Sequence, residues 1–167
     1  MAFPADQLRI LPYNRVIKDL NGHSPEAFLT ALEQRCQVSK AASPSPDRAG
    51  QVSMYLGGQW YGLSLQMPEQ AASPSDRLDV AILQAQVLEP LLGIADPRTD
   101  KRIDFVGGIR GTGELERRVQ AGAAVAFSMF PTSLEQLMAI SDANEIMPPK
   151  STWFEPKLRD ALLIHAV

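Results

Sequence analysis

The run Arg102-Ile-Asp-Phe-Val-Gly-Gly-Ile-Arg-Gly-Thr-Gly decides how the second half of the chain is expected to fold. Its apolar start predicts a short strand over 103–106. Its glycines predict a turn into a helix over 112–121, which Gly122 ends. The apolar run 123–130 then predicts an interior strand. Strand, helix and strand at this length predict a right-handed crossover with parallel strands.

A second helix is expected after the crossover, from Thr132 to about Ala143, because Thr132 and Glu135 have the spacing of a capping box. In a parallel crossover both helix starts lie at the sheet edge where open α/β sheets place ligands. Unpaired backbone N–H groups and the helix dipole favour an anion there. The alternative is that the glycines only let a strand turn into a helix. The residues expected to bind the anion are Arg110, Gly111, Thr112, Thr132 and Ser133.

The run Met147-Pro-Pro-Lys-Ser-Thr-Trp-Phe presents polar side chains from a backbone that two prolines stiffen. Lys150, Ser151 and Thr152 are therefore expected to join the same site. Asp104 is a candidate general base or metal ligand, against the alternative of a surface aspartate in an ion pair. The sequence shows no complete catalytic set and no metal site, and it leaves cofactors unknown. The glycine pattern is neither the dinucleotide fingerprint nor a Walker loop.

The first half of the chain predicts strands and two helices. Residues 8–17 predict an edge strand that Pro12 kinks. Ser24 is the expected N-cap of a helix over 25–35, and apolar residues on both flanks of 76–92 predict a helix enclosed at the centre of the fold. The class that follows is α+β: a mixed sheet with a hairpin, a central buried helix and a parallel β-α-β crossover followed by a helix.

The hairpin is expected around Gly57-Gly58, a two-residue turn in which glycine tolerates positive φ. Counting outward pairs Leu56 with Gln59 and places Tyr55 beside Trp60. The face opposite this aromatic pair should be buried. It carries Val52, Met54, Leu56, Tyr61, Leu63 and Leu65. Tyr55 and Trp60 either pack on the sheet or stack on a ligand.

Composition limits the class of protein. At 167 residues, with a net charge of -3, the chain is expected to form one domain over 1–167 and not to bind nucleic acid. The single thiol, Cys36, suits a reducing compartment and a buried position, and no run is long enough for a membrane helix. The expected location is cytoplasmic. Loops 39–50 and 67–75 are proline-rich and expected to be mobile, and residues 153–158 and 162–167 are expected to form a last strand pair.

Four runs in order resemble one bacterial family, the domain of unknown function 1015. They are Phe3-Pro-Ala-Asp-Gln-Leu-Arg-Ile-Leu-Pro-Tyr-Asn-Arg-Val, Leu88-Glu-Pro-Leu-Leu-Gly-Ile, Asp100-Lys-Arg-Ile-Asp-Phe-Val-Gly-Gly and Glu145-Ile-Met-Pro-Pro-Lys-Ser-Thr-Trp-Phe-Glu-Pro-Lys-Leu. Members of the family are longer and carry an Asp-Gly-His-His-Arg type motif upstream, which is absent here. The resemblance therefore implies that the chain corresponds to a carboxyl-terminal half.

The resemblance also implies a link to amino-acid metabolism. Family members are often encoded beside serine-biosynthesis enzymes, and the upstream motif is similar to that of sulfiredoxin-like folds, some of which phosphorylate free serine. The first hypothesis is that the chain contributes a cleft for a phosphorylated or carboxylated small molecule, in an enzyme that transfers phosphoryl groups. The second is a non-catalytic module that docks on the missing N-terminal half or on another copy.

Overall fold

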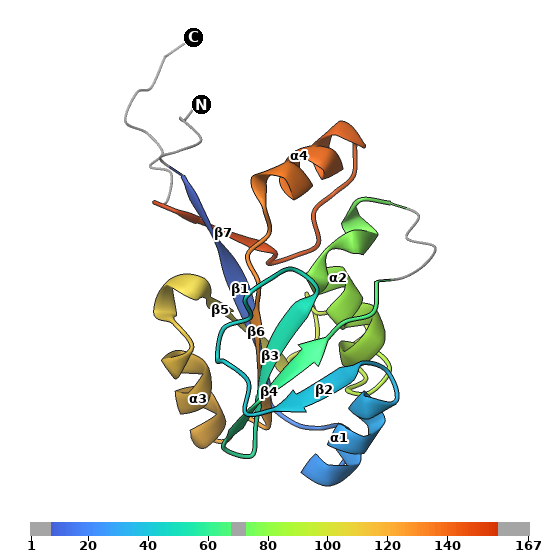
Figure 1. Ribbon diagram of the computed structural model, residues 1–167, viewed down its shortest axis with the longest axis vertical. Helices are drawn as coiled ribbons and strands as arrows, with labels where there is room; N and C mark the ends of the chain where they lie inside the picture. Colours follow the sequence, from blue (N-terminus) through green and yellow to red (C-terminus); the bar gives the residue numbers. More distant parts are fainter. Residues whose placement is uncertain (1–7, 68–72, 157–167) are drawn as a thin grey trace.

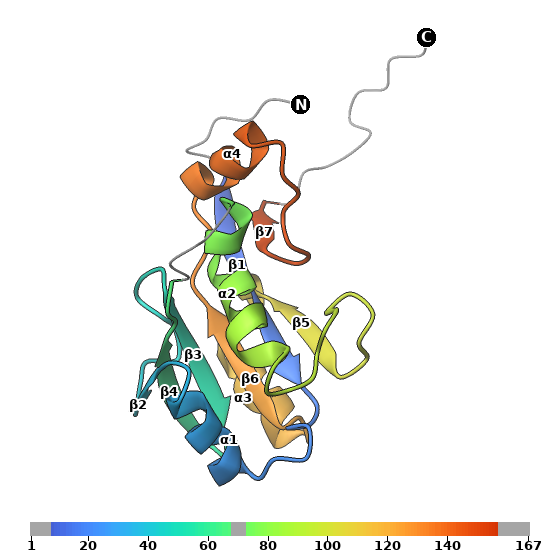
Figure 2. The same cartoon turned by 90° about the vertical axis from the view of Figure 1, so that its right-hand side faces the viewer.

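The computed structural model describes residues 8–67 and 73–156 of the chain, which fold as one sheet with helices on both faces (Figures 1 and 2). The strands are β1 (Arg9–Ile17), β2 (Gln37–Lys40), β3 (Gln51–Leu56), β4 (Gln59–Ser64), β5 (Ile103–Gly107), β6 (Val125–Met129) and β7 (Thr152–Glu155). The helices are α1 (Pro25–Glu33), α2 (Asp79–Leu83), α3 (Gly113–Gln120) and α4 (Leu134–Asp142). The α+β class expected from the sequence is confirmed.

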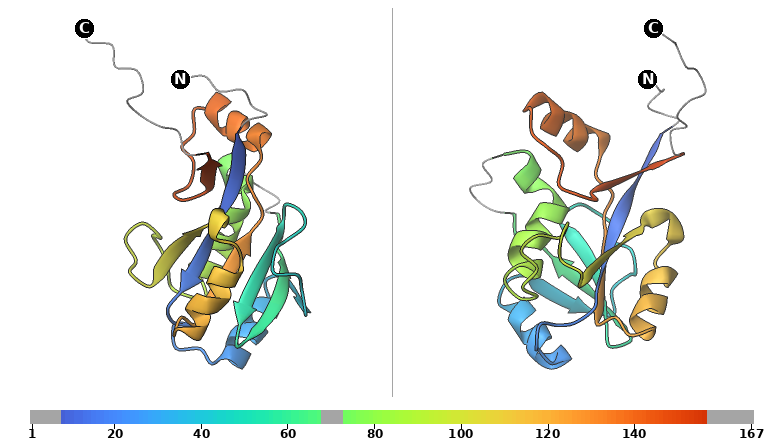
Figure 3. Two further views of the ribbon diagram at one scale, coloured as in Figure 1. Left: turned by 90° about the vertical axis from the view of Figure 1, so that its left-hand side faces the viewer. Right: turned by 180° about the vertical axis from the view of Figure 1, so that it is seen from behind.

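The sheet has the strand order β2-β4-β3-β6-β1-β5, and β7 pairs with the outer part of β1. The helices α1 and α2 cover one face, where Phe28 and Leu32 of α1 join the larger core cluster. Helix α3 covers the other face, where Leu115 packs with Val16 and Tyr55 in a smaller cluster (Figure 3). Successive residues of β1 therefore contribute to opposite faces, as the pleat of a strand requires.

The hairpin of β3 and β4 has the predicted register, with Leu56 opposite Gln59 and Tyr55 opposite Trp60. All six residues predicted for its buried face belong to the larger core cluster. The rings of Tyr55 and Trp60 lie 5.0 Å apart on the other face, where the Trp60 indole donates to Glu116 of α3 at 2.7 Å. The aromatic pair is thus covered by α3 and packs as part of the sheet.

The first strand is central, so its prediction as an edge strand was wrong. Residues Tyr13 to Ile17 pair with β5 on one side, and Arg15 to Ile17 also pair with β6 on the other. Pro12 precedes this doubly paired section and lies opposite Thr152 of β7. A proline lacks a ladder donor only at its own position, so the strand beyond it is free to occupy the middle of the sheet.

The crossover differs from the predicted one in its pairing. Both β5 and β6 run antiparallel to β1, which lies between them, so they share a direction without pairing. Every strand pair in the described part is antiparallel, and the sheet is not mixed in the predicted sense. The crossover could not be predicted from its own residues, because the strand inserted between β5 and β6 is β1, which lies about ninety residues upstream of β5.

The helix expected over 76–92 is broken into shorter pieces. A 3-10 turn over Ser75–Arg77 precedes α2, and a turn of π-helix over Gln84–Leu88 follows it. The predicted burial of this segment is confirmed, since its core side chains include Val80, Ile82, Leu83 and Val87. No helix in the part of the chain that the structure describes could cross a bilayer.

The starts of α3 and α4 differ in detail from the prediction. Thr112 is the N-cap residue of α3, but its side chain makes no capping hydrogen bond. Helix α4 is capped one residue later than predicted: Ser133 and Gln136 form the capping box instead of Thr132 and Glu135. At the end of the chain, β7 pairs with β1, and residues 162–167, including His165, lie outside the described residues.

Candidate functional site

The start of α3 and the segment that leads to α4 meet at one pocket of about 350 Å³, here called the α3 pocket. The turn before α3 contributes Gly108, Gly111 and Thr112, and the end of β6 contributes Ser128 through Pro131. Gly111 has φ of 69°, in the left-handed region that favours glycine. The floor comes from β1 and the rim from Ser45 and Pro46.

The floor of the α3 pocket carries two buried polar side chains, Asn14 and Ser128, which are 2% and 3% exposed. The Oδ1 atom of Asn14 accepts from the backbone N–H of Met129 at 3.0 Å, which fixes the orientation of the amide. Its Nδ2 group donates to no residue in the described part, and neither does the Ser128 hydroxyl. Both side chains line the pocket, so these two groups are available to a ligand.

Arg110 does not line the α3 pocket. Its side chain is 62% exposed and lies 4.0 Å from the carboxylate of Glu114 on the surface. Asp104 is also a surface residue, because Arg118 pairs with its carboxylate and the Phe105 N–H donates to it at 2.8 Å. The ion-pair alternative for Asp104 therefore fits its surroundings.

Two hydroxyl groups were expected to bind the anion at the start of α4, but one is buried and the other takes part in a capping hydrogen bond. Thr132 is buried. The Ser133 hydroxyl accepts from the Gln136 N–H at 3.2 Å, and the Gln136 side chain in turn accepts from the Ser133 N–H at 2.9 Å. Helix α4 thus satisfies two N–H groups at its start internally, and the segment before it reaches the α3 pocket at Phe130 and Pro131.

Residues Lys150, Ser151 and Thr152 do not line the α3 pocket. The Lys150 ammonium stands 5.4 Å from the centre of the Tyr13 ring, and Tyr13 faces the side of the sheet opposite to Asn14. The Ser151 hydroxyl donates to the Pro148 carbonyl at 2.6 Å, and Thr152 pairs with Pro12 in the sheet. The structure therefore brings Gly111 and Thr112 together with Pro131, and it separates them from Lys150.

Sequence reasoning missed a second pocket, on the opposite face of the sheet, here called the Arg15 pocket. It encloses about 370 Å³ between β1, the helical segment 80–88, the loop 95–98 and the prolines Pro148 and Pro149. Arg15 forms its floor and is 4% exposed. Burial lowers the pKa of the Arg15 guanidinium to about 10, so the group keeps its charge at neutral pH. An arginine directly before the apolar pair Val16 and Ile17 was the available signal.

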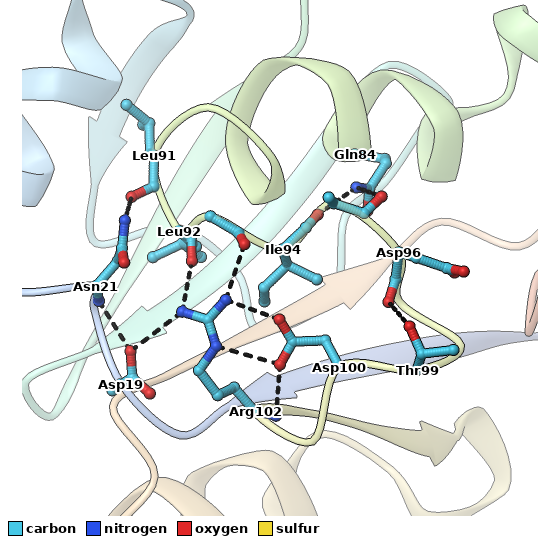
Figure 4. A network of polar contacts seen from close by, with 12 residues as sticks. Asp19, Asn21, Gln84, Leu91, Leu92, Ile94, Asp96, Thr99, Asp100 and Arg102 are labelled. Atoms are coloured by element: carbon cyan, nitrogen blue, oxygen red, sulfur yellow. Dashed lines mark hydrogen bonds and ion pairs between the residues drawn. The ribbon is translucent and has the colours of Figure 1, made fainter.

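The loop that walls the Arg15 pocket is held by a polar network (Figure 4). Gln84 Nε2 donates to the Ile94 carbonyl at 2.6 Å, which ties the loop to the π-helical turn. Arg102 donates to the carbonyls of Leu92 and Gly93 at 2.9 and 2.8 Å, and to Asp100 at 2.7 Å. Within the described ranges, no three His, Cys, Asp or Glu side chains gather in a way that could hold a metal ion.

Comparison with known proteins identifies one family. Residues 1–81 match the family model described as "Protein of unknown function (DUF1015)". The resemblance to this family is thereby confirmed for that part of the chain. The quoted runs from Leu88 onward lie outside the match. No curated protein matches the sequence.

Solved structures with a related outline include the free serine kinase in complex with AMP. That structure is 12% identical, with a TM-score of 0.47, and the alignment covers 90% of this chain and 55% of the kinase. A mutant of the kinase with ADP is 14% identical, with a TM-score of 0.49 and the same coverage. A conserved hypothetical protein from Pyrococcus furiosus is 13% identical, at 89% and 56% coverage and a TM-score of 0.47. The chain thus spans about half the length of these structures.

Proposed function

We propose that the chain contributes an anion-binding cleft to a small-molecule enzyme, with the α3 pocket as the cleft. The ligand group is a phosphate or carboxylate, and the proposed reaction class is phosphoryl transfer to an amino acid such as serine. The observation that carries this proposal is that Asn14 and Ser128 line the pocket beside the start of α3, with Asn14 Nδ2 and Ser128 Oγ as hydrogen-bond donors. Both groups can donate hydrogen bonds to an oxyanion.

The start of α3 adds further donors to this floor. The first turn of a helix has N–H groups without intrahelical acceptors, and the Thr112 side chain does not cap them. The positive end of the helix dipole lies at the same place, which favours a negative group. Gly111 has no side chain, and nothing lies within 4 Å of the position that a Cβ atom would take. A ligand can therefore approach the backbone closely.

Phosphoryl transfer fits such a cleft because the reaction depends on positioning and charge neutralisation more than on covalent chemistry. The link to serine comes from the family resemblance. No complete catalytic set lies around the α3 pocket in the described residues, so the cleft accounts for binding only. Catalytic groups are proposed to come from outside the described residues.

Thermal-shift measurements against phosphorylated metabolites and amino acids test the proposal. A ligand present at about one hundred times its Kd stabilises the folded chain by about 2.7 kcal/mol. We expect this stabilisation to disappear in Asn14→Asp, which keeps the acceptor for Met129 but replaces the free donor by a carboxylate. Thr112→Val should weaken it, and Arg110→Ala, outside the pocket, should retain it. Stabilisation by none of the anions, or equal stabilisation of Asn14→Asp, contradicts the proposal.

A second candidate function is a non-catalytic module that self-associates or docks on another domain. The observation that favours it is the exposed apolar surface on and after α4, where Met138 and Ile146 are 56% and 89% exposed. Such residues are usually covered in an interface when they cluster. If the module reading is correct, sedimentation should show a concentration-dependent dimer that Met138→Glu abolishes and Met67→Glu, on another exposed methionine, preserves. A monomer at all concentrations argues against self-association.

A further inference from the structure

The charge of Arg15 has no counter-ion among the described residues. Arg15 is paired with Phe105 and Phe127 across the central strands, and its guanidinium carbon lies 5.6 Å from the centre of the Phe105 ring. One of its terminal nitrogens donates to the Tyr13 carbonyl. No Asp or Glu in the ranges 8–67 and 73–156 forms an ion pair with it. A buried charge without a partner is costly, and proteins rarely keep one without a use.

The remaining donors of Arg15 are suited to an oxyanion. A guanidinium has five N–H groups in a planar fork, and the Tyr13 carbonyl uses one of them. The fork matches a carboxylate or phosphate with two parallel hydrogen bonds. The contact of the cation with the Phe105 ring also stabilises the position of the group. The arginine is therefore held in place before a ligand arrives.

The other charges of the Arg15 pocket cancel. Asp96 and Arg98 both line it and pair with each other through two hydrogen bonds of 3.0 Å. The three charged side chains of the pocket, Arg15, Asp96 and Arg98, therefore sum to one positive charge. An anion that carries one negative charge neutralises this pocket, while a dianion leaves one negative charge uncompensated.

The walls of the pocket are mainly apolar. Val80, Ala81 and Leu88 come from the helical segment, and Pro148 and Pro149 face them from the other side. Binding sites of this kind combine an apolar wall with a few placed polar groups that orient the ligand. A π-helical turn over Gln84–Leu88 forms part of the wall, and such turns are frequent at functional sites.

We infer that the Arg15 pocket binds a small monocarboxylic acid, with its carboxylate on the Arg15 guanidinium and its hydrocarbon part between Val80, Leu88 and the two prolines. This site is separate from the α3 pocket, since Arg15 and Asn14 are neighbours in β1 and face opposite sides of the sheet. A monocarboxylate is favoured over phosphate because of the single net charge and the apolar walls. The inference does not depend on the proposed function.

The test is a titration of the ¹⁵N-labelled full chain with 4-methylpentanoate, followed by NMR. Expected shifts lie at Arg15, Val80 and Ala81, and they should be absent with 4-methylpentanamide, which has the same shape without the charge. Arg15→Met should weaken binding roughly tenfold or more, since a charge-assisted pair of hydrogen bonds is lost. Arg9→Met, on the exposed part of the same strand, is the matched control and should bind as the wild type does.

Three results would overturn the inference: the amide binds as well as the acid, Arg15→Met keeps the affinity, or no shift appears near Arg15. Inorganic phosphate is a separate arm of the experiment. Shifts at Arg15 with phosphate as strong as with the acid would also overturn the assignment to a monocarboxylate. If Arg15→Met fails to fold, Ala81→Leu tests the same site, because it narrows the pocket from α2 and leaves Arg15 in place. Unchanged binding in Ala81→Leu contradicts the inference, and loss of binding supports it.

Discussion

Gly107 lies directly beneath the indole ring of Trp153, and a Cβ atom at position 107 would fall 2.6 Å from Cζ3 of that ring. Gly107 is opposite Tyr13 in the pairing of β5 with β1, and the Tyr13 ring meets the Trp153 ring edge-on at 5.4 Å between centres. The absence of a side chain at Gly107 therefore lets β7 and its tryptophan pack onto the sheet. This contact links the end of the described chain to its central strands.

Gly107→Ala is expected to destabilise the chain by about 1–3 kcal/mol, the usual cost of overpacking a close contact. The tryptophan must shift, so its fluorescence should change as well. Gly113→Ala is the matched control, because nothing lies within 4 Å of a Cβ there and alanine is a better helix former. Urea denaturation measures both variants. Equal stability of Gly107→Ala and the wild type would show that Trp153 does not pack as described.

Arg102 is expected to matter more for stability than other exposed arginines. It closes the loop after α2 onto β5 by donating to Leu92, Gly93 and Asp100. Loss of these bonds in Arg102→Ala leaves two carbonyls without their donor, so we predict a clear fall in Tm. Arg98→Ala removes a surface pair with Asp96 and should change Tm little. Equal Tm values for the two variants would contradict the role assigned to Arg102.

Local patterns in the sequence predicted the hairpin, including its register, because two adjacent glycines fix the turn and alternation fixes the buried face. The position of β1 could not be predicted in the same way. Its neighbours β5 and β6 lie far along the chain, and nothing local in 9–17 shows that both edges are paired. Pro12 favoured an edge, and the section of β1 that pairs on both sides begins only after it.

The candidate site was predictable only in part. Glycines before α3 indicated the turn that lines the α3 pocket, and the approach to α4 does reach the same pocket at Pro131. Asn14 and Arg15 were missed because their importance comes from burial beside a pocket, which depends on the complete fold. Lys150 was expected at the same site because two prolines stiffen the backbone that presents it, but such a local feature does not show which part of the sheet the segment meets, and the following strand pairs with the outer part of β1.

The thiol of Cys36 is expected to be unreactive in the folded chain. It is 4% exposed, its Sγ lies 3.5 Å from the Leu32 carbonyl, and burial raises the pKa of the thiol. Thiolate is the reactive form, so labelling with a disulfide reagent should be slow at neutral pH. Denaturant should accelerate labelling to the rate of a model thiol. Fast labelling without denaturant would mean that the α1 end of the core opens readily.

Glu114 is expected to make the stability of the fold depend on pH, with a loss of stability in acid. Hydrogen bonds from Arg117 and Arg118, at 2.7 and 2.8 Å, lower the pKa of its carboxyl from 4.5 to about 2. A carboxyl with a lowered pKa in the folded state stabilises the fold fully above its ordinary pKa, and this contribution is lost as pH falls through the folded value. Stability should therefore decrease between pH 4.5 and about 2. Denaturation across this range should show a shallower decrease for Glu114→Gln, with Glu33→Gln as an exposed control. An unchanged slope in Glu114→Gln would show that the two arginines do not hold this carboxylate in solution.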